Sequence, residues 1–254
     1  MPTPTAVVLP GTGSDEVFVR SVFAGPLGAL GIPLLAPPPA PGGAVVEGGL
    51  TVLDDLAREV GTPLLVGGIS LGAHLATEWA LRHPDRCAGV LAALPGWHGE
   101  PGDAPAAVAA RASADLVERE GLDGALAAAT AGVAPWLAAE LTRAWRRHGD
   151  GLADGLRAAA AHPAPAPASL RTLDVPVGIA ACVDDPVHPL AVARVWEGAL
   201  PRVRLAETTL AAFGADRESL GHAAVDAWLR AGRRSPDDTD GTGERDPAGR
   251  VAPR

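Results

Sequence analysis

A serine stands between two glycines in the segment Gly68-Ile69-Ser70-Leu71-Gly72. The apolar run Thr62–Ile69 before it is typical of a buried strand, and Leu71–Arg82 follows with a helical pattern. A G-x-S-x-G motif is a weak signal alone and gains weight from a strand before it and a helix after it. A sharp turn there would expose the hydroxyl at a helix N-terminus, where developing negative charge is favoured. The segment predicts a nucleophilic serine, with an idle hydroxyl in a strand-to-helix junction as the alternative.

A serine hydroxyl is a poor nucleophile until a base removes its proton, and that base must be oriented. The last third of the chain offers both kinds of residue. Asp184 and Asp185 directly follow the apolar run Val175–Cys182, and His222 follows the run Pro201–Thr209 through a loop, at the start of the last helical pattern. Because parallel strands present their carboxyl ends at one edge of a sheet, we expect these side chains at the edge that carries the serine.

Short apolar runs alternate with helical patterns along most of the chain. The expected strands are Thr5–Pro10, Gly31–Pro37, Thr62–Ile69, Cys87–Pro95, Val175–Cys182 and Pro201–Thr209. The expected helices are Asp15–Leu30, Thr51–Val60, Leu71–Arg82 and Pro189–Ala199, with Ser14 or Asp15 as N-cap of the first. Such alternation predicts an α/β fold with a parallel sheet and helices on both faces. The alanine-rich interval Gly96–Ser169 has no convincing strand and predicts three or four short inserted helices.

From Thr5 to Arg230 the chain resembles the serine hydrolases of the α/β-hydrolase fold. The resemblance implies a mostly parallel six-stranded sheet, a core domain over residues 1–95 and 170–231, and a helical cap insertion over residues 96–169. It also implies that the chain begins at the family's third strand, without the usual N-terminal hairpin. By the family's motifs, Ser70 would be the nucleophile and His222 the general base. Asp185 would be the acid, because Asp185 and Pro189 fit the pattern Asp-x-x-x-Pro; Asp184 remains the alternative.

The same resemblance implies an oxyanion hole made of two backbone N–H groups, from Leu71 and from Thr12 in the loop after the first strand. Family members often have His-Gly in that loop, where this chain has Pro10-Gly11. Trp97 and His98, just past the fourth expected strand, are expected at the hinge of the cap as substrate-binding residues, with simple packing as the alternative.

Two further features could belong to the site or could be ordinary structure. His74 lies four residues past Ser70, so it shares a helix face with the serine and either borders the site or is packed. Arg146, Arg147 and His148 form a basic cluster that could attract an anionic substrate such as a coenzyme A thioester, or be a solvated helix face.

Composition limits the remaining possibilities. The chain has 254 residues, 47% of them hydrophobic, and a formal net charge of −9, so nothing in its charge favours a nucleic-acid partner. We expect a cytoplasmic protein, because the N-terminus does not resemble a secretory signal and no apolar stretch approaches the length of a membrane span. Two cysteines are too few for a structural zinc cluster, and no metal or organic cofactor is expected. Residues 232–254 are expected to be disordered.

These patterns together predict a serine hydrolase that cleaves a small to medium carboxylic ester through an acyl-enzyme, with a small-molecule acyl substrate as its partner. A thioesterase or an acyltransferase would use the same residues with a different leaving group or acceptor. A non-catalytic binding protein on a hydrolase scaffold is the alternative of another class, since fold alone does not decide function. The acyl chain, the leaving group and the oligomeric state stay open.

Overall fold

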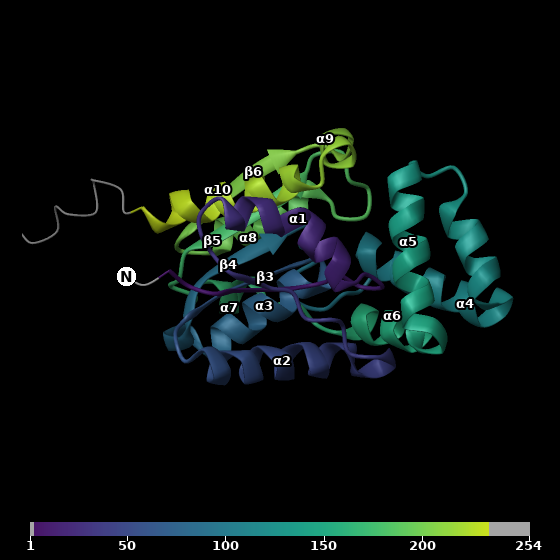
Figure 1. Cartoon of the computed structure of the whole chain (residues 1–254), viewed down its shortest axis with the longest axis horizontal. Helices are drawn as coiled ribbons and strands as arrows, with labels where there is room; N and C mark the ends of the chain where they lie inside the picture. Colours follow the sequence, from purple (N-terminus) through teal and green to yellow (C-terminus); the bar gives the residue numbers. More distant parts are fainter. Residues whose placement is uncertain (1–2, 234–254) are drawn as a thin grey trace, which may run out of the picture.

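The computed structural model describes residues 3–233 (Figure 1). All the strand pairings in its sheet are parallel, and the strand order is β2-β1-β3-β4-β5-β6. The strands are β1 (Ala6–Leu9), β2 (Leu34–Leu35), β3 (Leu64–Ile69), β4 (Cys87–Ala93), β5 (Val177–Cys182) and β6 (Val203–Thr208). The predicted six-stranded parallel α/β sheet is confirmed. Gly232 ends the last helix, and the predicted disordered tail lies, from residue 234 on, outside the described residues.

Helices cover both faces of the sheet. On one face lie α1 (Glu16–Gly28) and α10 (Glu218–Gly232), and on the other α2 (Val45–Val60), α3 (Leu71–Arg82) and α8 (Leu190–Ala199) (Figure 1). Side chains alternate between the faces along each strand. In β1, for example, Val8 belongs to the cluster that contains Phe23 of α1, whereas Val7 belongs to the cluster that contains Trp79 of α3. All four side chains are buried.

Local signals predicted most of these helices. The helix α3 has the predicted bounds, and Asp15 is the N-cap of α1, where its side chain accepts a hydrogen bond from the Phe18 N–H. The helix α2 starts six residues before the predicted Thr51. Its first turns were not predicted because they contain Gly48 and Gly49, which are weak helix formers. A Cβ on Gly48 would lie 2.3 Å from the Ala40 Cβ, so close packing accounts for a glycine there.

The interval between β4 and β5 is helical, and we call residues 96–169 the helical insertion. Its elements are α4 (Pro105–Thr130), α5 (Pro135–His148), the 3-10 turn η3 (Gly149–Gly151), α6 (Leu152–Ala161) and α7 (Pro167–Leu170). The helix α4 is much longer than predicted, although Gly121, with a φ of 72°, breaks it into two parts. In Figure 1, α4, α5 and α6 stand together at one end of the molecule, beyond the sheet.

The remaining short elements are the 3-10 turns η1 (Gly42–Ala44) and η2 (Pro84–Arg86) and the helix α9 (Leu210–Ala215), which follows β6 and was not predicted. None of the helices within residues 3–233 is long and apolar enough to cross a membrane.

Ion pairs fasten the helical insertion to the start of α1. Arg143 of α5 donates from Nε to Asp15 Oδ2 at 2.9 Å and from Nη2 to Asp15 Oδ1 at 2.7 Å. The Asp15 side chain is fully buried, and Arg147 pairs with Glu16 one turn along α5. Burial acts to raise the pKa of Asp15, but the hydrogen bonds from Arg143 and Phe18 keep that pKa below its usual value. A buried carboxylate with this partner ties α5 to the loop before α1.

We predict that Arg143→Met lowers the free energy of unfolding at pH 7 by about 3 kcal/mol, because it leaves the buried Asp15 carboxylate without its partner. Urea unfolding measures the change. As a control, Arg119→Met removes an exposed ion pair of α4 and should change the free energy by less than about 0.5 kcal/mol.

The pH dependence of the free energy of unfolding provides a second check on the effect of Arg143→Met. Because the folded state lowers the pKa of Asp15, the stabilisation is present above about pH 4 and is lost as pH falls through the folded-state pKa. The difference in the free energy of unfolding between the parent and Arg143→Met should therefore become smaller in acid. An equal difference at pH 7 and in acid would contradict this account of Asp15.

Candidate active site

Ser70 occupies a strained turn between β3 and α3. Its backbone has a φ of 53° and a ψ of −115°, a conformation that residues with a side chain rarely adopt. The glycines on either side permit the turn: a Cβ on Gly68 would lie 2.1 Å from the Gly72 carbonyl carbon, and one on Gly72 would lie 2.4 Å from the Leu9 oxygen. The two glycines of the motif are therefore required by close backbone contacts, and the turn brings the Ser70 side chain to the wall of a cavity.

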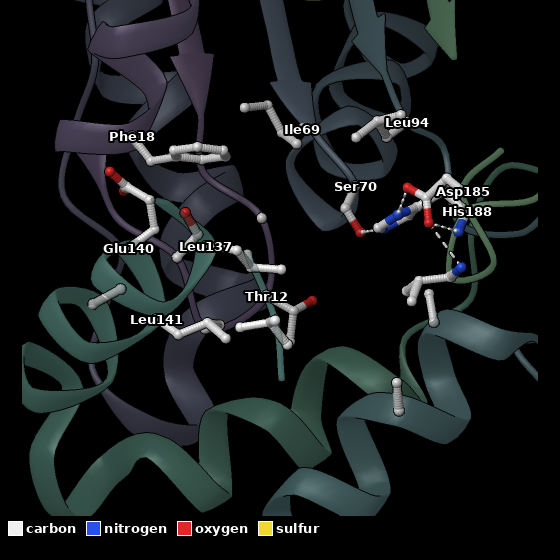
Figure 2. Close-up of a pocket in the computed structure, with 18 of the residues that line it drawn as sticks. Thr12, Phe18, Ile69, Ser70, Leu94, Leu137, Glu140, Leu141, Asp185 and His188 are labelled. Atoms are coloured by element: carbon white, nitrogen blue, oxygen red, sulfur yellow. Dashed lines mark hydrogen bonds and ion pairs between the residues drawn. The ribbon is translucent and has the colours of Figure 1, made fainter. Parts of the chain in front are cut away.

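The Ser70 hydroxyl belongs to a chain of hydrogen bonds with His188 and Asp185 (Figure 2). Ser70 Oγ lies 3.0 Å from His188 Nε2, and His188 Nδ1 lies 2.9 Å from Asp185 Oδ2. Because an ionised carboxylate only accepts hydrogen bonds, the His188 proton belongs on Nδ1 and the lone pair of Nε2 faces the serine hydroxyl. This tautomer allows His188 to take a proton from Ser70.

The Asp185 carboxylate also shapes the loop that carries the histidine. Its Oδ1 accepts hydrogen bonds from the backbone N–H groups of Val187 at 2.8 Å and of His188 at 3.1 Å. Burial acts to raise the pKa of Asp185, but the hydrogen bonds from the His188 ring and from these two N–H groups hold that pKa below its usual value. Asp185 therefore remains a carboxylate at neutral pH and orients the His188 ring.

The structure contradicts the assignment of His222 as the base. His222 is exposed on α10, whereas its neighbour Gly221 packs so closely on α1 that a Cβ there would lie 2.0 Å from the Val22 oxygen. The buried side of α10 faces the sheet and α1, so His222 points to solvent. No hydrogen bond within residues 3–233 joins His222 to Ser70 or Asp185, and the position at the serine belongs to His188.

Asp184, the alternative acid, has a different role. It is exposed, and its Oδ1 accepts a hydrogen bond at 2.7 Å from the backbone N–H of Leu210, at the start of α9. Asp184 thereby joins the loop after β5 to the loop after β6. The two neighbouring aspartates thus serve different partners, and Asp185 is the one that contacts the histidine.

The sequence around His188 contains a local signal for its role. An aspartate side chain that accepts the N–H groups two and three residues ahead forms a tight turn. In Asp185-Pro186-Val187-His188 such a turn brings the third residue back to the carboxylate. The spacing Asp-x-x-His directly after a buried strand could therefore have marked His188 as a candidate base.

The expected oxyanion donors are the N–H group of Leu71, next to Ser70, and that of Thr12, in the loop after β1. Leu71 is the first residue of α3, so its N–H has no partner within the helix. Thr12 lines the same cavity as Ser70, and its N–H makes no backbone hydrogen bond in the part of the chain that the structure describes. The loop passes close to the serine, since a Cβ on Gly11 would lie 3.5 Å from the Ser70 Cβ. Neither N–H group has a backbone partner within residues 3–233, and their assignment as oxyanion donors stays a prediction.

The residues expected to bind substrate do not line the cavity. Trp97 is buried: its indole N–H donates to the His162 carbonyl at 3.3 Å, and its ring packs edge-on against His74 with the centroids 4.5 Å apart. His98 is exposed and points away from the core. Trp97 is therefore a packing residue at the base of the helical insertion, and the expectation that Trp97 and His98 contact substrate finds no support in the cavity wall.

His74 is wholly buried behind the candidate base. Its Nε2 accepts a hydrogen bond from the Gly96 N–H at 3.0 Å, and burial lowers its pKa to about 3, so the ring is neutral. A Cβ on Gly96 would lie 3.7 Å from His74 Cε1 and 3.8 Å from His188 Cδ2. His74 thus supports the backbone against which the His188 ring rests.

A cavity of about 990 Å³ lies between the sheet edge and the helical insertion, and Ser70, Asp185 and His188 form part of its wall. Most of the rest is apolar, as Figure 2 shows for Phe18, Ile69, Leu137 and Leu141. Within residues 3–233, no three His, Cys, Asp or Glu side chains come together in a way that could hold a metal ion.

No family model matches the chain, and neither does any curated protein sequence. Among solved structures it is similar to an enol-lactonase from Burkholderia xenovorans, at 17% identity and a TM-score of 0.69 over 90% of this chain and 92% of that one. A thermophilic esterase from Thermogutta terrifontis has 16% identity and a TM-score of 0.64, covering 91% and 92% of the two chains. A bromoperoxidase from Bacillus anthracis has 16% identity and a TM-score of 0.69, covering 90% and 92%. These are α/β-hydrolase fold proteins, and this chain has the α/β-hydrolase fold.

We predict that Gly72→Ala lowers the free energy of unfolding by at least about 2 kcal/mol, because the added Cβ would press on the Leu9 and Pro10 carbonyl oxygens. Urea unfolding measures the effect. Gly198→Ala is the matched control, since a Cβ on this exposed glycine of α8 meets nothing within 4 Å. An unchanged unfolding midpoint for Gly72→Ala would show that the turn does not need its glycine.

Proposed function

We propose that the chain is a serine hydrolase that cleaves a small to medium carboxylic ester through an acyl-enzyme. The observation that supports this proposal most strongly is the hydrogen-bond chain from Ser70 through His188 to Asp185, at a strained turn that faces a cavity. A hydroxyl, a base and a carboxylate in this order are the groups required for nucleophilic acyl transfer.

In the proposed first half-reaction, Ser70 Oγ attacks the ester carbonyl carbon while His188 Nε2 takes the hydroxyl proton. The negative oxygen of the tetrahedral intermediate lies between the N–H groups of Thr12 and Leu71, which can supply several kcal/mol of transition-state stabilisation. His188 then gives its proton to the oxygen of the leaving alcohol, and the acyl group stays bonded to Ser70 Oγ. Asp185 stabilises the positively charged ring during these steps.

The second half-reaction uses the same groups, with water as the nucleophile and Ser70 Oγ as the leaving group. His188 takes a proton from a water molecule, which attacks the acyl carbon and forms a second tetrahedral intermediate in the same oxyanion site. The intermediate collapses when His188 returns the proton to Ser70 Oγ. The products are the carboxylic acid and the free enzyme, so no cofactor takes part in the proposed cycle.

The basic cluster at the end of α5 does not support a coenzyme A thioester as the substrate. Arg147 pairs with Glu16, and His148 Nε2 contacts the Ser14 carbonyl oxygen at 2.9 Å. Arg146 lies 3.6 Å from Asp123 on the outer side of the helical insertion. Of these three cluster residues, none lines the cavity, so the cluster belongs to the attachment and surface of α5.

The proposal predicts different results for the two histidines. His188→Ala should lower kcat/KM for a 4-nitrophenyl ester by at least about 100-fold, because the serine loses its base. His222→Ala should leave kcat/KM unchanged, because this histidine is exposed on α10. Steady-state release of 4-nitrophenol measures both effects.

Covalent labelling with a fluorophosphonate, followed by mass spectrometry, identifies the nucleophile in the same set of proteins. The parent and His222→Ala should carry the adduct on Ser70, His188→Ala should react much more slowly, and Ser70→Ala should carry none. Hydrolysis that survives Ser70→Ala, or equal losses for the two histidine variants, would contradict the proposed mechanism. A binding protein on this scaffold would hydrolyse none of the esters and would not label at Ser70.

A further inference from the structure

The cavity next to Ser70 is apolar almost everywhere. The side chains that α5 contributes to it include Trp136, Leu137, Leu141 and Trp145, and those of α4 are small. Among residues 3–233, the lining contains no arginine, and apart from the Asp185–His188 pair its one ionisable side chain is Glu140. An apolar chain can therefore fill most of this space, and a charged group in it would meet Glu140.

Glu140 lies on the cavity wall across from the serine. Figure 2 shows it beside Phe18 on one side of the view, with Ser70 and His188 on the other. Its side chain is 24% exposed, so most of it is covered by protein. A carboxylate in such surroundings acts on nearby charges more strongly than one in bulk water.

The positive charge next to Glu140 is already shared. Arg143 contacts Glu140 Oε2 with the same Nη2 that donates to the buried Asp15 carboxylate, and its Nε also donates to Asp15. Two carboxylates therefore share one guanidinium, and the group of three side chains has a formal net charge of −1. The next basic residues along α5 are Arg146, which lies 3.6 Å from Asp123, and Arg147, which pairs with Glu16. Another guanidinium, that of Arg217, lies 4.0 Å from the centroid of the Trp136 ring and donates to the Phe213 and Gly214 carbonyls, but Arg217 does not itself line the cavity. Among the described residues that line this wall, Glu140 is therefore the charged side chain, and no cation lies there to receive an anion.

We propose that the cavity takes the acyl chain of esters of uncharged, apolar carboxylic acids, and that Glu140 excludes acyl chains that end in a carboxylate. The inference rests on the proposed function. The acyl group is the part of an ester that stays bonded to Ser70 through both half-reactions, so it occupies the cavity longest. Glu140 contacts none of the reacting atoms and is a specificity residue, whose effect depends on the charge at the far end of the chain.

Three esters that differ only at that far end test the inference. They are 4-nitrophenyl hexanoate, the mono-4-nitrophenyl ester of adipic acid, which ends in a carboxylate, and 4-nitrophenyl 6-aminohexanoate, which ends in an ammonium group. The parent should have a kcat/KM at least about tenfold lower for the carboxylate ester than for the hexanoate. In Glu140→Gln, which keeps the shape of the side chain, that ratio should shrink by about tenfold, while kcat/KM for the hexanoate stays the same. The ammonium ester should become a poorer substrate relative to the hexanoate.

Asp123→Asn is the matched control. It removes the same charge from an exposed carboxylate on the outside of the helical insertion and should leave all three ratios unchanged. An unchanged carboxylate-to-hexanoate ratio in Glu140→Gln, or an equal change in Asp123→Asn, would overturn the role of Glu140. Failure of the proposed function has a different signature, since hexanoate hydrolysis would then be absent or would survive Ser70→Ala.

Discussion

The candidate site depends on one carboxylate that receives three hydrogen bonds. Asp185 accepts the N–H groups of Val187 and His188 and the Nδ1 proton of the His188 ring. The first two contacts fold the chain into a turn, and the third fixes the ring within that turn. Because acid and base lie three residues apart in one loop, their relative position depends on a local turn and hardly at all on how distant parts of the fold pack. The distant contact that remains is the one from His188 to Ser70.

Because the base His188 lies in the loop after β5, the loop after β6 contributes no residue to the hydrogen-bond chain. The helix α9 follows β6 instead, and residues 210, 211, 213 and 214 belong to the cavity wall. Phe213 of α9 packs against Phe18 of α1 and Trp136 of α5. The ion pair of Arg143 with Asp15 holds α5 against the loop that contains Thr12. The same contacts that attach the helical insertion therefore also set the position of a proposed oxyanion donor and of Glu140.

What could be predicted from the sequence was local, and what was missed depended on tertiary contacts. The strand β3, the turn at Ser70 and the helix α3 follow from an apolar run, two glycines and a helical pattern within about twenty residues. The prediction of His222 as the base rested on the order of residues along the chain, which says nothing about the direction of a side chain on α10. In the structure His222 is exposed on α10, whereas the turn at Asp185 places His188 beside the carboxylate.

The same distinction explains the other differences. Trp97 lies where the chain leaves β4, which is the right region, but its indole packs on His74 and not into the cavity. A large part of the cavity wall comes from α4 and α5, and their sequences carry no motif that would reveal which of their faces is turned to the serine. Glu140 could be recognised only after the fold had brought α5 next to Asp15.

The most direct test of the central claim is a crystal structure of the chain after reaction with a fluorophosphonate. The account predicts phosphorus bonded to Ser70 Oγ, the phosphonyl oxygen within hydrogen-bond distance of the Leu71 and Thr12 N–H groups, and His188 Nε2 beside the adduct with Asp185 on its Nδ1. An unmodified Ser70, or an adduct with the His188 ring turned away and another side chain in its place, would contradict it.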